Sequence, residues 1–155
     1  MATRLDQNII TILNQLVEAC RKRRGGYEIA RTGIGTPDVQ QLFEQCAQRS
    51  EQFEEELEEI IREHGEEPAD RASASGPKLQ AWTHIKVVAL TGDEGVILAE
   101  CEHGEDATLE RYEEILGAPL PAELRERLMQ QFSEIRQAHN HIRSLRDSVR
   151  ISPTE

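Results

Sequence analysis

The sequence has few aromatic residues, no long apolar run and no alternating pattern typical of β-strands. Aromatic residues make up 4% of the chain, and runs of β-branched or aromatic residues with a period of two are missing, which argues against a sandwich or barrel. No apolar run reaches the roughly 18 residues that a membrane span needs. The N-terminus, MATRLDQNII, has charged and polar residues where a secretory signal needs an apolar segment, so a cytoplasmic location is predicted.

Cysteine is also scarce, which bears on disulfides and metal sites. The three cysteines, Cys20, Cys46 and Cys101, are widely spaced and include no CxxC pair. An odd number without close pairs indicates neither a disulfide framework nor a zinc knuckle. We expect reduced thiols in or near the core.

Acidic charge is abundant. The chain has 29 acidic against 18 basic residues and a net charge of -11, which opposes binding to nucleic acid and to anionic membranes. Neither partner is therefore expected. The length of 155 residues fits a single domain covering positions 1–155.

Apolar residues recur at helical spacing nearly throughout, so the predicted class is all-α. Thr36, Pro37 and Asp38 mark a helix start, and Gly117 and Pro121 separate the last two helices. The predicted helices cover residues 4–31, 37–64, 79–90, 94–116 and 121–150.

The connections predict how these helices are arranged. Short links at 32–36 and 117–120 make antiparallel pairs, and a long link joins the pairs. This pattern predicts a ferritin-like up-down four-helix bundle, with a long crossover that carries the extra helix 79–90. Trp82, Ile85 and Val88 form an apolar strip on that helix, which either seals one end of the core or supports dimerisation.

A resemblance to a known family rests on four stretches that together span nearly the whole chain. They are LNQLVEACRKRRGGY, FEQCAQRSEQFEEEL, ALTGDEGVILAECEHGEDATLERYEEIL and IRQAHNHIRSLRD. The chain resembles the bacterial family of small ferritin-like four-helix-bundle proteins classed as a domain of unknown function. The resemblance implies that the first helix continues through Gly25 and Gly26 to about Arg31, although adjacent glycines favour a kink or an early end.

Glu105 is the main candidate site residue. It lies in the apolar stripe Leu98, Cys101, Glu105, Leu109 and Tyr112, and a buried carboxylate costs several kcal/mol unless it is paired or bound to metal. His139 occupies the corresponding stripe of the next helix. Cys20 lies seven residues before Tyr27, as Glu105 does before Tyr112, so Cys20 and Glu105 are expected to be equivalent in the two hairpins.

Ferritin-like metal centres place one Glu on each of two helices and a Glu-x-x-His motif on each of the other two. Cys20 and Glu105 are the nearest matches to the two lone acids. The nearest matches to the two paired motifs are Gln48 with Glu51 and Arg136 with His139. Only Glu105 and His139 fit the pattern, so an intact di-iron centre is not expected.

Two interpretations of these residues stay open. In one, Glu105, His139, Glu51 and Cys20 hold a single zinc or iron ion, with Glu102 as a further ligand one turn before Glu105. In the other, Glu105 hydrogen-bonds Tyr27, a glutamine or water, and His139 is a satisfied core histidine. The basic run 21–24 is expected to pair with nearby glutamates.

These patterns predict a non-enzymatic structural or interaction protein, connected with stress by analogy to related folds, with a homodimer or a protein as partner and no cofactor. No catalytic residue is assigned, because no serine or cysteine has an assignable base and orienting acid. The alternative is a metal-binding protein or a metal-dependent oxidoreductase with a degenerate ferritin-like site in the bundle core.

Overall fold

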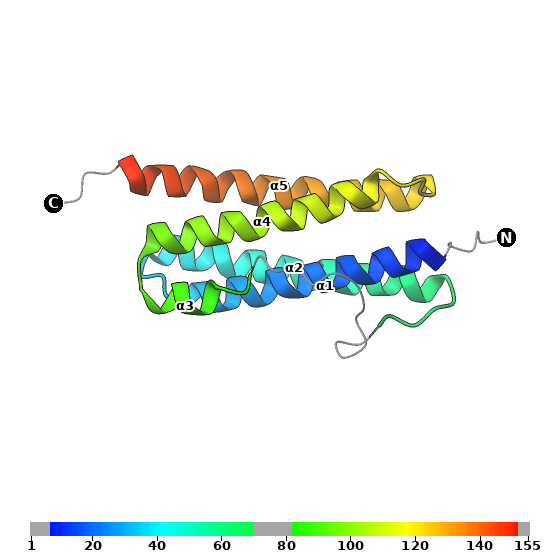
Figure 1. The fold of residues 1–155 in the computed structure, drawn as a ribbon, viewed down its shortest axis with the longest axis horizontal. Coiled ribbons are helices and arrows are strands. Elements are labelled where there is room, and N and C mark those ends of the chain that lie inside the picture. The colour runs from blue at the N-terminus through cyan, green and yellow to red at the C-terminus, as the bar shows by residue number, and fades with distance from the viewer. Residues whose placement is uncertain (1–6, 70–81, 152–155) are drawn as a thin grey trace.

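The computed structural model describes residues 7–69 and 82–151. It contains the helices α1 (Gln7–Arg31), α2 (Pro37–Glu63), α3 (Ile85–Leu90), α4 (Glu94–Leu116) and α5 (Ala122–Ile151) (Figure 1). No strand occurs in these two ranges, so the all-helical class is confirmed. Within the same ranges, no helix combines the length and the apolar character needed to cross a membrane.

The long helices form two antiparallel pairs, α1 with α2 and α4 with α5 (Figure 1). The pairs are in contact through α1 and α4, and α3 packs on both of these helices at one end. A surface ion pair, Arg49 Nη2 to Glu134 Oε2 at 2.7 Å, links α2 to α5. Helix α1 is thus in contact with α2, α3 and α4.

The observed helix bounds agree closely with prediction except at α3. The predicted helices 37–64, 94–116 and 121–150 each fit within one residue, and α1 continues through both glycines to Arg31. The predicted start at residue 4 lies outside the described residues, as do positions 79–81. The predicted helix 79–90 is wrong over residues 82–84, which form a turn before α3 begins at Ile85.

Packing of Trp82 explains this late start. Its indole, 4% exposed, lies between α1 and α4. A Cβ atom added at Gly26 would come within 2.1 Å of Trp82 Cε3, and one added at Gly104 within 2.4 Å of Cε2. The chain turns at 82–84 to bring the ring into this space, since tertiary packing overrides helix propensity. Trp82 and Ile85 are buried and Val88 is half-buried against the same cluster, so the apolar strip covers one end of the core.

The apolar core is divided into two clusters by a polar layer. One cluster contains Leu16, Phe53 and Leu128, and the other contains Tyr27, Phe43 and Ile142. Between them, each long helix contributes a buried polar side chain, and these are Arg23 of α1, Ser50 of α2, Glu105 of α4 and His139 of α5. These buried polar side chains are the candidates for a functional site.

Candidate functional site

An ion pair between Arg23 and Glu105 occupies the centre of the polar layer. Arg23 Nε donates to Glu105 Oε1 at 2.5 Å, and Arg23 Nη2 donates to Oε2 at 2.9 Å. The third contact runs from Arg23 Nη1 to Ser50 Oγ at 2.6 Å. The arginine and glutamate side chains are 2% and 0% exposed. The guanidinium therefore contacts both oxygens of the buried carboxylate.

The charge of Glu105 keeps Arg23 ionised. Burial on its own would lower the pKa of Arg23, but the nearby carboxylate and its hydrogen bonds outweigh that effect and raise the pKa. The guanidinium also lies over the ring of Tyr27, 5.3 Å from its centroid. Glu105 is thus a hydrogen-bonded core group, as one interpretation of the sequence holds, but its partner is Arg23 rather than Tyr27 or a glutamine.

A second buried network lies beside this pair. Cys20 Sγ is 3.3 Å from the hydroxyl of Tyr112, which donates to Gln131 Oε1 at 2.7 Å. Burial raises the pKa of Cys20 to about 12 and that of Cys46 to about 11. All three cysteines are buried and free, as predicted. Because the thiolate is the metal ligand and nucleophile, a protonated Cys20 is poorly suited to either role.

The other arginines of the basic run also pair with glutamates, as predicted. Arg21 Nη2 contacts Glu58 Oε2 at 3.0 Å, and Arg24 Nε contacts Glu54 Oε2 at 2.6 Å. Arg21 and Arg24 therefore link α1 to α2 through ion pairs, whereas Arg23 links α1 to α4.

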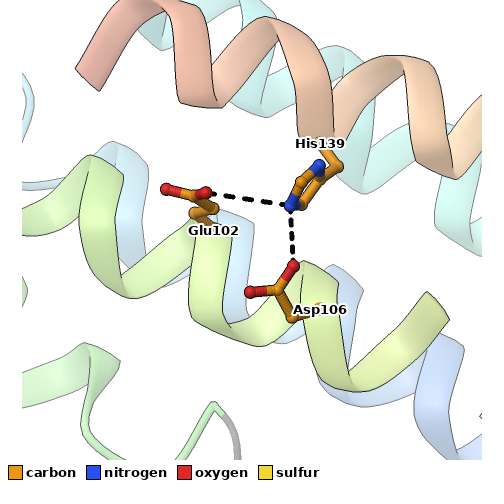
Figure 2. Close-up of side chains that lie close together, drawn as sticks. All are labelled: Glu102, Asp106 and His139. Carbon is orange, nitrogen blue, oxygen red and sulfur yellow. Dashed lines mark ion pairs between the residues drawn. The ribbon is translucent and has the colours of Figure 1, made fainter. Parts of the chain in front are cut away.

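A different cluster lies at the seam between α4 and α5, where Glu102, Asp106 and His139 face one another (Figure 2). His139 Nε2 is 2.7 Å from Asp106 Oδ1 and 3.8 Å from Glu102 Oε2. One donor atom from each residue lies within 4.8 Å of the other two. Within residues 7–69 and 82–151, no other group of three His, Cys, Asp or Glu side chains converges in this way. We call this cluster the seam triad.

Cations and a groove border the seam triad. Arg143 Nε lies 3.2 Å from Glu102 Oε2, and Arg146 Nη1 contacts Glu102 Oε1. His139 Nδ1 lies 3.1 Å from Asn140 Oδ1. A groove of about 580 Å³ opens beside His139, between α4 and α5, and its lining includes Leu109, Phe132, Arg136, Asn140 and Arg143.

The predicted ligand set does not converge on one point. Glu102 and His139 come together, whereas Glu105 is bound by Arg23 and Cys20 by Tyr112. Glu51 is exposed, because Ser50 is the α2 residue that faces the centre and successive helical residues are turned by about 100°. Sequence reasoning missed Asp106, although its spacing of four residues from Glu102 on the same helix was an available signal.

A family model described as "Domain of unknown function (DUF2383)" matches residues 8–118 of this 155-residue chain. The chain belongs to this family. The DUF2383 match contains Arg23, Ser50, Glu102, Glu105 and Asp106, whereas His139 and the rest of α5 lie beyond it. No curated protein matches the chain in sequence. The family description assigns no activity, so function has to be argued from the polar layer itself.

Proposed function

We propose that this DUF2383 chain is a ferritin-like up-down bundle that works as a non-enzymatic structural or interaction protein, with a guanidinium in the place of a central metal ion. The observation that carries the proposal is the contact of Arg23 with both oxygens of Glu105 in the bundle interior. Two antiparallel helix pairs and a long connection between them support the ferritin-like comparison (Figure 1).

Charge at the centre argues against a metal ion there. Ferritin-like di-metal centres gather several carboxylates around two ions. Here the central charges are one carboxylate and one guanidinium, which cancel. A divalent cation would have to displace an arginine that is part of the chain and leave it buried without a partner, which is strongly unfavourable.

The remaining central groups do not supply redox or nucleophilic chemistry either. Burial keeps Cys20 protonated at neutral pH, and its thiol is already hydrogen-bonded to Tyr112. Ser50 accepts a hydrogen bond from Arg23, which is not a base. The proposed work of the protein is therefore done by contacts at its surface; a homodimer or protein partner, a cytoplasmic location and a role in stress stay predictions.

Iron oxidation tests the proposal directly. The tag-free protein is incubated with iron(II) in air, and the rate of iron(II) oxidation and the protein-bound iron are compared with buffer alone. We expect the rate to equal that of buffer, and Glu105→Gln to bind the same amount of iron as the wild type.

Asp106→Asn is the matched control, because it changes a carboxylate on the same helix outside the bundle centre. Oxidation above the buffer rate that is lost in Glu105→Gln and kept in Asp106→Asn would contradict the proposal. An ion lost only in Asp106→Asn belongs to the seam and is compatible with a metal-free centre.

A further inference from the structure

We propose that the seam triad, Glu102, Asp106 and His139, binds one divalent transition-metal ion on the α4–α5 seam, at a site separate from the buried Arg23–Glu105 pair. The two acids are four residues apart on α4 and so lie on one face of that helix. His139 reaches toward both of them from α5 (Figure 2).

The donor atoms are spaced as a single ion requires after a small adjustment. Metal bonds to carboxylate oxygen and imidazole nitrogen of about 2.0–2.2 Å place neighbouring ligand atoms about 3–3.5 Å apart. The observed separations from His139 Nε2, 2.7 Å to Asp106 and 3.8 Å to Glu102, lie on either side of that range. Asp106 has a side chain that is 60% exposed, so it can move outward to admit an ion.

The orientation of the His139 ring is the second observation that points to a cation. The residue is 8% exposed, and its Nε2 atom is buried without a hydrogen-bond partner. Asp106 Oδ1 is close enough for a hydrogen bond, but the two groups lack the alignment that such a bond needs. A polar atom buried in this way calls for an explanation, and a role as a metal ligand is one.

The opposite ring nitrogen of His139 has an oxygen atom as its partner. Nδ1 lies 3.1 Å from Asn140 Oδ1, which fits an Nδ1–H donating to the amide oxygen. The lone pair of Nε2 then points toward two carboxylates, an arrangement that is repulsive for neutral imidazole and favourable once a cation lies between them. Metal-bound histidines are oriented in the same way, by donating the distal N–H to an oxygen.

The two arginines on Glu102 have different effects on the proposed ion. Arg146, with 23% of its side chain exposed, holds Oε1 and leaves Oε2 facing His139, as partners of ligating carboxylates do. Arg143, with 58% exposed, contacts Oε2 itself and competes with an ion for that oxygen. Removing Arg143 should therefore tighten metal binding at Glu102.

The ligand set defines the class of ion. Two carboxylates and one imidazole suit zinc(II), manganese(II) or iron(II) rather than a soft, thiolate-bound ion. Three protein ligands leave coordination positions open, and the groove beside His139 gives water or a small ligand access to them.

Zinc chloride titrated into the chelator-treated full chain, followed by calorimetry, tests the proposal, with cobalt(II) absorption as a readout of coordination. We expect about one equivalent to bind, as at a single three-ligand site. Asp106→Asn and His139→Gln should each weaken binding at least about 10-fold, because a ligand is lost. Glu105→Gln should bind as the wild type does, and Arg143→Gln should bind several-fold more tightly.

Nitrogen-15 NMR of the His139 ring distinguishes a metal ligand from a simple ion pair. We expect the Nε2 signal of His139 to shift when zinc is added. Ring signals that do not respond to zinc, or equal zinc binding by wild type and His139→Gln, would overturn the proposal. Circular dichroism and thermal unfolding of each variant establish that the fold is retained.

Discussion

Glu102 and Glu105 lie one turn apart on α4, and both are buried and paired with arginine, yet their surroundings differ. Glu105 is bound by Arg23, which reaches it from inside the bundle and is 2% exposed. Glu102 is bound by Arg143 and Arg146, whose side chains are 58% and 23% exposed. Two glutamates of the same helix thus differ in their surroundings. Glu105 forms an ion pair closed off from solvent, whereas Glu102 lies at the edge of an accessible cluster.

The comparison shows that burial of the cation, more than burial of the acid, determines whether a carboxylate can exchange partners. Separating the Arg23–Glu105 pair would leave a charge in the core without a counterion, which is costly. Arg143 can leave Glu102 for water at little cost, because its side chain is 58% exposed. A ligand can therefore compete at the seam but not at the centre.

The largest expected effect is that of breaking the central pair. Arg23→Met should lower the free energy of unfolding by about 3–5 kcal/mol, because Glu105 remains buried without a counterion. Arg24→Met, at the next position, removes a pair whose side chains are 19% and 9% exposed, and should cost less, because Arg21 stays 3.8 Å from Glu54. Chemical denaturation of both variants measures the difference.

A double variant sharpens this test. Arg23→Met combined with Glu105→Leu removes both charges, so much of the lost stability should return. Equal stabilities of Arg23→Met and Arg24→Met would mean that the central pair is no more important than the Arg24–Glu54 pair.

Disturbing the packing of Trp82 against α1 should have the next largest effect on stability. Gly26→Ala should destabilise the fold by about 1–3 kcal/mol, since the new Cβ would overlap the ring of Trp82. The neighbouring Gly25 has no atom within 4 Å of an added Cβ, so Gly25→Ala should stabilise α1 by about 0.5–1 kcal/mol. We expect the midpoint of thermal unfolding to fall for Gly26→Ala and to rise for Gly25→Ala. Shifts of the same sign would contradict the position of the Trp82 ring.

A smaller change in the free energy of unfolding is expected at alkaline pH. The pKa of Cys20 is raised to about 12 in the folded state, so above the unfolded value near 9 the unfolded chain loses a proton that the folded chain keeps. Stability should therefore fall as pH rises above 9, by about 1.4 kcal/mol per pH unit for this thiol. Cys20→Ala should show a shallower decline between pH 9 and 10, and an unchanged slope would exclude Cys20 as a contributor.

Much of the fold could be predicted from sequence, because helical periodicity and turn residues act locally. The apolar stripe of α4 also indicated that Glu105 is buried, which the structure confirms. Arg23 was not predicted as the partner of Glu105, although the sequence contains a signal for it. Arg23 lies three residues after Cys20 and four before Tyr27, in the inward-facing stripe, while the basic run was treated as a unit.

The same periodicity places Ser50, not Glu51, between Cys46 and Phe53 on the inner face of α2. The seam could not be predicted in this way. The approach of Asp106 to His139 depends on how α4 and α5 are rotated about their axes, which the packing of whole helices determines. Local patterns therefore identify which residues face inward, but not which residues of neighbouring helices meet.

The position of Trp82 has a practical consequence. It is the sole tryptophan of the sequence, and its ring lies against Gly26 of the first helix pair and Gly104 of the second. Its fluorescence is therefore a built-in reporter of whether the two pairs are together. A red shift in its emission would mark the separation of the two helix pairs in real time.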